Sequence, residues 1–433
     1  MKIKNTQWLL LLIGILGYGW AEAHSLPDCK AQLLVQSEQV VIKFRSPYEI
    51  LELASKAKID LSSQESVEAL KRYLVQHTHI SDSLHSKWTI TASTITTGQT
   101  TDPNIGTYPE IIAELYLKPD NSNSLHSFVL HSDWVIHQIP TQSILVSVEQ
   151  DWANGIIENS GQQLGMIAWD IPSGKILPLQ IQLEQGSWIK GFVSMLKLGM
   201  THIQEGTDHI LFVVVLLLPC MLVPIGKRWS SYRGLKSSLL EILSLVTAFT
   251  VGHSLTLLLG ALEWVQLPSQ PVEVLIAVSI LVSAVHAIFP IFSGKEKYIA
   301  IGFGLIHGLA FSSILADLTV STPILLVSIL GFNLGIELMQ LLLIAGIIPW
   351  LLVLSQTRIY FCIRLTGAIL SSIAAIGWIM ERVSGQGNAI TSVVNQLPDF
   401  ALPIIIGLAL VAVIAFLIQR LSFISRQFYT KST

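Results

Sequence analysis

The chain has 433 residues, of which 51% are hydrophobic and only 13% charged, whereas soluble domains average about 25% charged residues. Its formal net charge of -3 leaves no broad basic face, which argues against nucleic acid as a partner. Because the apolar residues are concentrated after residue 200, we expect a polytopic membrane protein with a soluble N-terminal part.

The first 23 residues have the pattern of a secretory signal peptide. A basic start precedes an apolar core at 9–19 and a small-x-small cleavage site at 21–23. An uncleaved anchor helix is the alternative interpretation, and in both cases the following residues lie outside the cytoplasm. Cleavage after residue 23 would leave His24 at the N-terminus, where its amine and imidazole could chelate copper or nickel.

Residues 24–190 read as an exported, mostly-β domain, which we interpret as sandwich-like with a helical insertion. The helix is expected at 63–77, because Ser62 begins a capping-box pattern there. Cys29 is the domain's single cysteine, so we expect no internal disulfide. The histidine-containing run at 77–85 could collect a metal ion, although a solvated loop is the simpler interpretation. Strands are expected within 31–44, 113–118, 127–139, 143–150 and 172–186.

From about residue 191 the pattern changes to apolar runs that are each long enough to cross a membrane. Basic residues are concentrated in the loop at 227–236 and in alternate loops after it, and the positive-inside rule then places the N-terminus outside and the C-terminus inside. We therefore expect an all-α seven-helix membrane domain over 191–424 and a cytoplasmic tail at 425–433. The expected spans lie near 200–224, 238–262, 271–293, 298–317, 322–353, 359–380 and 401–420.

Four ionisable residues lie on the first turns of the first span, within THIQEGTDHILF at 201–212. A charged side chain costs roughly 3 kcal/mol at the centre of a membrane helix, so such groups indicate function. On a continuous helix, His202, Glu205 and His209 share one face and Asp208 lies about 60° further round. Imidazole and carboxylate together suit a borderline divalent metal ion. The helical rise puts the two histidines ~10.5 Å apart, which predicts two successive stations, an outer one at His202 and an inner one at Asp208 and His209.

Later spans carry further histidines. His253 lies towards the outer half of the second span and His307 near the middle of the fourth, where Gly304 and Gly308 form a small-xxx-small pair that allows close helix packing. His286, in the inner half of the third span, is better explained as a donor of an interhelical hydrogen bond. We expect His253 and His307 to lie in the outer half or the middle of the bundle.

The fifth span carries a polar face formed by Asn333, Glu337 and Gln340, at spacings i, i+4 and i+7. A glutamate at this depth requires a partner, a proton or a cation. Asn333 and Gln340 are equally well explained as interhelical hydrogen-bonding groups, and Gly331 and Gly335 again allow tight packing. The predicted metal-ligating residues of the chain are therefore His202, Asp208, His209, His253, His307, Asn333 and Glu337.

Four motifs carry a family resemblance, and they occur in order on the expected spans. Together they resemble the HupE/UreJ family of membrane proteins, in the branch that places a large exported domain before the membrane part. The resemblance covers about residues 190–380. The motifs are HIQEGTDH at 202–209, TVGHSLTL at 250–257, GLIHGLAF at 304–311 and FNLGIELMQ at 332–340.

The resemblance implies a secondary permease for a divalent transition metal, with nickel as the cargo, in a bacterial plasma membrane. It also implies that His202, Asp208 and His209 form the first metal motif, and that His307 with Gly308 belongs to the second. The family's permeases carry HGxAxE in that second motif, whereas this chain has a serine, Ser312, at the acidic position.

The missing carboxylate puts nickel specificity and transport in question. We expect Glu337 on the fifth span to supply the charge instead.

Two other functions remain open from the residues. An intramembrane hydrolase could hold a zinc ion with the same histidines and aspartate, next to Ser254, Ser312 and Ser313. Alternatively, the protein is a membrane-anchored sensor or assembly protein whose exported domain binds a periplasmic partner. No Walker A motif is present in the sequence, so we expect no ATP hydrolysis, and the partners of the permease are the lipid bilayer and the metal ion.

Overall fold

A computed structural model of the chain describes residues 27–430 except 85, 103–105, 122–124, 158–160 and 317–319, and it leaves the side chains of residue 93, 312–316 and 421–430 undescribed. The predicted signal peptide and His24 lie outside the described residues. The chain divides into two compact units. The N-terminal unit is described from residue 27 to Asp151 and again up to Gln185, and the helical unit contains Trp152–Ile157 and the chain from Gly186 onward.

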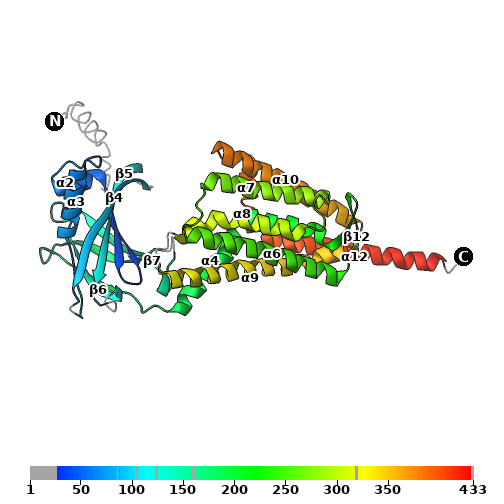
Figure 1. Cartoon of the computed structure of the whole chain (residues 1–433), viewed down its shortest axis with the longest axis horizontal. Helices are drawn as coiled ribbons and strands as arrows, with labels where there is room; N and C mark the ends of the chain where they lie inside the picture. The colour runs from blue at the N-terminus through cyan, green and yellow to red at the C-terminus, as the bar shows by residue number, and fades with distance from the viewer. Residues whose placement is uncertain are drawn as a thin grey trace, which may run out of the picture. The chain divides into compact units, whose positions relative to one another are not determined.

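The N-terminal unit is built mainly from β-strands, as predicted (Figure 1). Its larger sheet has seven strands in the order β4-β5-β2-β1-β7-β8-β9, and a second sheet has three in the order β10-β6-β3. β1 pairs with β7 in parallel, so the larger sheet is mixed. The strands are β1 (Cys29–Val35), β2 (Val40–Pro47), β3 (Thr78–Ser81), β4 (Trp88–Asp102), β5 (Gly106–Pro119), β6 (Ser127–Ser132), β7 (Ser143–Asp151), β8 (Gln162–Asp170), β9 (Lys175–Ile176) and β10 (Leu179–Gln182).

Several details of this unit differ from the prediction. The segment 31–44 is an antiparallel pair of strands rather than one strand, because residues 36–39 turn the chain back on itself. The run at 77–85 contains β3 and is therefore not simply a loop. A sandwich is not confirmed, since the mixed seven-stranded sheet and the short three-stranded sheet differ from a pair of antiparallel sheets.

Two helices belong to the N-terminal unit. The predicted helix is present as α3 (Gln64–Gln76), but its N-cap is Ser63, whose hydroxyl accepts a hydrogen bond from the Ser66 amide at 3.4 Å, so the capping box expected from Ser62 is wrong. The helix α2 (Tyr48–Ser55) was not predicted, although it begins directly after Pro47, a residue that favours a helix start. Cys29 is a buried free cysteine, and burial raises the pKa of its thiol to about 12.

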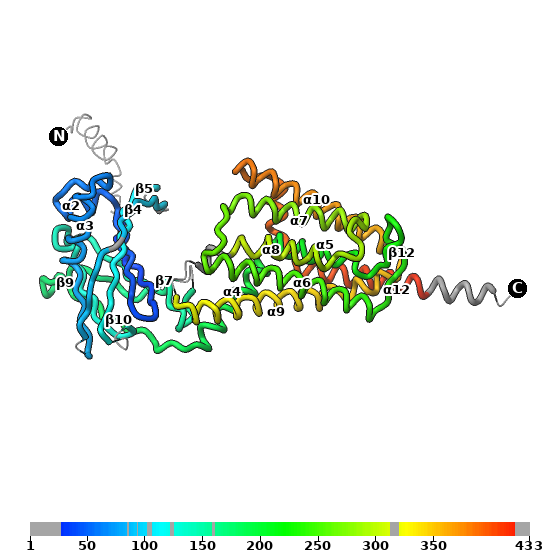
Figure 2. The backbone as a smooth tube through the Cα atoms, in the orientation of Figure 1, coloured from blue at the N-terminus to red at the C-terminus, as the bar shows by residue number. Residues whose placement is uncertain are grey.

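The C-terminal part is a helical bundle, in which Figure 1 shows α4, α6, α8 and α9 running along one another and Figure 2 traces α7 beside α10. A short antiparallel pair of strands, β11 (Leu222–Ile225) and β12 (Arg228–Tyr232), precedes α6 and includes part of the predicted basic loop. The helices are α4 (Trp188–Glu205), α5 (Thr207–Leu217), α6 (Leu235–Ala261), α7 (Ser269–Ile288), α8 (Glu296–Ala316), α9 (Thr322–Leu354), α10 (Ile359–Ser384), α11 (Ala389–Val394) and α12 (Ala401–Thr430).

Within the described residues, five helical segments are long and apolar enough to cross a membrane, and a sixth span results if the bent pair α4–α5 counts as one. These segments make the chain a membrane protein, and the count of seven spans remains a prediction. The expected first span at 200–224 is wrong as a continuous helix. It is interrupted after Glu205 and ends in a 3-10 turn and β11.

Glycines allow the helices of the bundle to pack backbone against backbone, as predicted for both glycine pairs. A Cβ on Gly304 of α8 would lie 2.1 Å from the Phe249 carbonyl oxygen of α6, and one on Gly308 would lie 2.3 Å from that of His253. A Cβ on Gly335 of α9 would lie 2.0 Å from the Leu196 carbonyl oxygen of α4. These contacts hold α6 against α8 and α4 against α9, the four helices that carry most of the predicted site.

We expect Gly304→Val to lower the thermal unfolding temperature of the detergent-solubilised protein, because the added side chain must push α8 away from α6. Overpacking of this kind costs about 1–3 kcal/mol. Gly302→Val on the same helix is the matched control, since a Cβ there meets no atom within 4 Å. Equal unfolding temperatures for the two variants would contradict the packing described here.

Candidate metal centre

The site begins with a break in the chain between α4 and α5. Gly206 ends one helix and begins the next with φ -74° and ψ 88°, and the two helices meet at a bend of 72°. A Cβ on Gly206 would lie 2.7 Å from the His202 carbonyl oxygen and 2.8 Å from Nδ1 of His209. Glycine therefore permits both the break and the close approach of the histidine that follows it.

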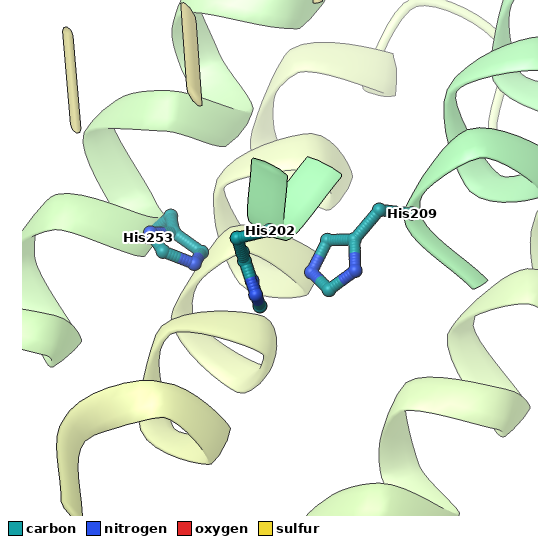
Figure 3. Close-up of side chains that lie close together, drawn as sticks. All are labelled: His202, His209 and His253. Atoms are coloured by element: carbon teal, nitrogen blue, oxygen red, sulfur yellow. The ribbon is translucent and has the colours of Figure 1, made fainter. Parts of the chain in front are cut away.

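The break brings three imidazoles together: His202 from α4, His209 from α5 and His253 from α6 (Figure 3). Each residue offers one nitrogen such that all three nitrogens lie within 4.8 Å of one another, and the rings of His202 and His209 are 4.6 Å apart. The separation of ~10.5 Å that a continuous helix predicts is therefore wrong. The two successive stations inferred from that distance are also wrong, because the bend brings His209 of α5 towards the end of α4.

The cluster has nitrogen atoms without hydrogen-bond partners. Nε2 of His202, Nε2 of His209 and both ring nitrogens of His253 are buried and unpaired within the described structure. A buried polar group without a partner costs about 1–3 kcal/mol, so native structures usually pair such groups. Three such imidazoles side by side have the chemistry of a transition-metal ligand set.

Asp208 orients His209 rather than joining the three nitrogens. Its Oδ1 accepts hydrogen bonds from the His209 backbone amide at 2.9 Å and from Nδ1 of the same residue at 3.0 Å. Because Nδ1 then carries the proton, Nε2 of His209 keeps its lone pair for a ligand. A carboxylate behind an imidazole is a common arrangement in metal sites, where it fixes the tautomer and raises the basicity of the ring.

Aromatic rings line one side of the cluster. The sequence analysis did not identify them. Phe311 of α8 and Phe332 of α9 stack on each other with their centroids 4.3 Å apart, and they lie 4.5 Å and 5.5 Å from the His202 ring. The motifs at 304–311 and 332–340 contain both residues, which was the available signal. An apolar wall of this kind lowers the local dielectric and strengthens electrostatic interactions within the cluster.

His307 lies next to the three-histidine cluster but is not part of it. Its ring is 5.1 Å from that of His209, and its Nε2 is 3.0 Å from the Ser279 hydroxyl of α7. Its Nδ1 is buried and unpaired within the described structure. Ser279 was not predicted, because a single serine in an apolar span carries no distinctive signal.

The predicted residues of the fifth span lie at the edge of the three-histidine cluster or outside it. Asn333 of α9 is buried beside His253, with no ordinary hydrogen bond to its side-chain oxygen. Gln340 accepts a bond from Thr250 of α6 at 3.4 Å, in agreement with a role between helices. Glu337 is half-buried between them, and among the described residues its carboxylate has no ion pair and does not join the nitrogen cluster.

Other candidates lie apart from the cluster. Glu205, which sequence reasoning grouped with the histidines, is exposed at the end of α4. His286 of α7 stacks on Phe292 with a centroid distance of 3.7 Å, beside Trp229, but neither ring nitrogen has a hydrogen-bond partner within the described structure, so the predicted interhelical donor is wrong. The side chain of Ser312 lies outside the described structure. A cavity of about 930 Å³ near Glu241 and Glu296 does not include the imidazoles.

These features define a polytopic membrane protein with a buried imidazole cluster at the junction of three helices. Residues 179–382 match the family model described as HupE / UreJ protein, so this part of the chain belongs to the HupE/UreJ family, as the sequence motifs predicted. This family is associated with metal transport. No curated protein matches the chain.

We expect Asp208→Asn to weaken metal binding at the cluster by about 10–100-fold, the usual effect of removing a carboxylate that supports a ligating histidine. Calorimetric titration of the detergent-solubilised protein with Ni²⁺ measures this, and the heat that His202→Ala removes identifies the cluster. The matched control is Glu205→Gln, an exposed carboxylate on the same segment. Equal effects of the two substitutions would show that Asp208 acts only through its charge.

Proposed function

We propose that this protein is a permease for a divalent transition metal ion, and that His202, His209 and His253 bind the ion during its passage. The observation that carries the proposal is the set of three imidazoles, two buried and one partly buried, which come from three different helices and whose buried nitrogens lack partners within the described structure. Nickel is the expected cargo, because the sequence motifs resemble those of nickel permeases. The association of this family with metal transport supports the same proposal.

The ligand chemistry favours a borderline metal over a hard one. Imidazole suits nickel, zinc, copper and iron, whereas magnesium and calcium prefer carboxylate, carbonyl and water oxygens. The three nitrogens can replace three water molecules of the ion's hydration shell and leave other positions open. Asp208 supplies its negative charge through His209, so the cluster balances part of the ion's charge without a direct carboxylate bond.

A site of three neutral ligands is suited to transient binding. It carries no thiolate that would hold the ion permanently, and protonation of the imidazoles releases the metal, since ligands must be deprotonated to bind. His307, one ring further along from His209, is the next ligand that we assign to the path. A membrane potential of 100 mV contributes about 2.3 kcal/mol for each elementary charge, so a divalent cation moving inward needs no ATP.

We further propose that the N-terminal unit lies outside a bacterial plasma membrane and the C-terminus inside. The distribution of basic residues supports this orientation, because the hairpin loop between α5 and α6 is rich in lysine and arginine. The imidazole cluster then lies where α4 ends and α5 turns back. Glu337, one helical turn from Asn333, is the acidic residue that we assign in place of the one missing at Ser312.

We expect wild-type protein to restore uptake of radioactive nickel in a bacterial strain that lacks its own nickel transporters, and His253→Ala to abolish it. His253 is fully buried and neither ring nitrogen has an ordinary hydrogen-bond partner within the described structure, although Asn333 lies beside it, so its loss removes a ligand of the cluster. His286→Ala is the matched control, a buried membrane histidine outside the cluster, and we expect uptake to persist at comparable expression.

Absence of uptake by well-expressed wild type would reject nickel import. A zinc hydrolase would use the same three nitrogens but hold its ion permanently. Zinc that survives prolonged dialysis of the wild type, and is lost in His253→Ala, would therefore favour that alternative over a permease.

A further inference from the structure

Three of the histidines in the N-terminal unit, His77, His79 and His131, lie on one face of the three-stranded sheet. β3 pairs with β6 so that Thr78 lies opposite Ser132, and both of these side chains are buried. Because successive residues of a strand point to opposite faces, the next pair, His79 and His131, points outward and is exposed. His77 precedes Thr78, so it belongs to the same outward face.

His77 forms a compact cluster with two further side chains, Asp133 and His137. His77 follows α3, Asp133 follows β6, and His137 lies in the turn one helical repeat further on. The Asp133 amide donates to the His77 carbonyl oxygen at 3.2 Å, which continues the strand pairing by one residue. Each of the three residues offers one ligand atom, and these atoms all lie within 4.8 Å of one another.

The hydrogen bonds within the cluster leave one nitrogen on each imidazole free to bind a ligand. Nδ1 of His77 lies 2.7 Å from Oδ1 of Asp133, and Nδ1 of His137 donates to the Asp133 backbone carbonyl oxygen at 2.8 Å. Nε2 therefore remains as the lone-pair nitrogen of both rings, which stack with a centroid distance of 4.3 Å. Ligating histidines commonly donate their other N–H to a carboxylate or a backbone carbonyl in this way.

Tyr73 of α3 supports the cluster without joining it. Its ring lies 4.5 Å from that of His77, and its hydroxyl donates to the Trp134 carbonyl oxygen. Burial and the nearby charge of Asp133 raise the pKa of Tyr73, so its hydroxyl remains protonated and is not an anionic ligand. The cluster itself is half-buried, which fixes its side chains and leaves them within reach of solvent.

A purely structural explanation accounts for only part of this arrangement. The bond between His77 and Asp133 would by itself anchor the end of α3 to the end of β6. It does not require a second imidazole stacked on the first, and two protonated imidazoles at this distance would repel each other. Imidazoles whose other N–H is held by a carboxylate or a backbone carbonyl are, in contrast, a common arrangement in sites for zinc, nickel and related ions.

We propose that His77, Asp133 and His137 form a second metal site, which binds one exchangeable divalent transition metal ion in the N-terminal domain. Nε2 of each of the two imidazoles supplies a protein ligand, Asp133 supports the site by accepting the Nδ1 proton of His77, and water completes the coordination. The site is half-exposed, so the ion can enter and leave without a conformational change. A role in capturing the ion before it reaches the membrane cluster follows only if the proposed transport function holds.

The test is equilibrium dialysis of the full-length protein against Ni²⁺, in detergent and without a polyhistidine tag. We expect the double variant His77→Ala/His137→Ala to lose about one bound ion per chain relative to wild type, and the variant His202→Ala/His253→Ala to retain that ion. The matched control is His79→Ala, an exposed histidine on the same face that lies outside the three-residue cluster.

Asp133→Asn keeps the shape of the site and is the second variant, in case loss of both imidazoles unfolds the domain. We expect this substitution to weaken binding of the same ion by about tenfold or more and to leave the circular dichroism spectrum unchanged. Unchanged nickel binding in both site variants would overturn the proposal. So would an equal loss in His79→Ala, because the metal would then bind to exposed histidines in general.

The membrane variant separates this proposal from the transport function. Loss of nickel uptake in His202→Ala/His253→Ala with the N-terminal ion retained supports both. If the wild-type protein binds the N-terminal ion but imports no nickel, the proposed transport function is rejected and the proposed second site is supported.

Discussion

The break in the first membrane segment at Gly206 is the feature on which the candidate metal centre depends. A continuous helix would carry His202 and His209 two turns apart, where no single ion could contact both. At the break, α5 turns through 72°, and the two imidazoles meet the His253 ring of α6. The short hydrogen-bonded link between Asp208 and His209 then turns the free nitrogen of that ring towards the others.

The rest of the bundle keeps these groups in place. Glycines on α8 and α9 let two neighbouring helices approach until backbone packs against backbone, so the imidazoles lie on helices that cannot easily shift. Stacked phenylalanines cover one side of the cluster. Nitrogens buried without partners are costly, and binding of a metal ion would offset that cost. The cost of unpaired nitrogens is smaller at the half-exposed site of the N-terminal domain, where water can hydrogen-bond to them.

Sequence patterns identified most of the components but not their arrangement. Hydropathy located the apolar segments, the polar run at 62–65 and the following apolar spacing located α3 although the cap was placed one residue early, and the order of four motifs identified the family. The prediction from helical periodicity was wrong at residues 200–209, because periodicity assumes an unbroken helix. It does not reveal that a single glycine interrupts the helical hydrogen bonds. It also grouped Glu205 with the histidines, although that side chain is exposed. The run at 77–85 was the one sign of the cluster at His77, Asp133 and His137, because His77 lies 56 residues before Asp133 and meets it only through strand pairing.

The most direct test of the account is X-ray absorption spectroscopy of the nickel-loaded protein carrying His77→Ala and His137→Ala, which leaves the membrane cluster as the assigned site. The account predicts about three imidazole ligands on the bound ion, with the count falling by about one in His202→Ala. A spectrum with oxygen ligands and at most one imidazole, unchanged by His202→Ala, would contradict it.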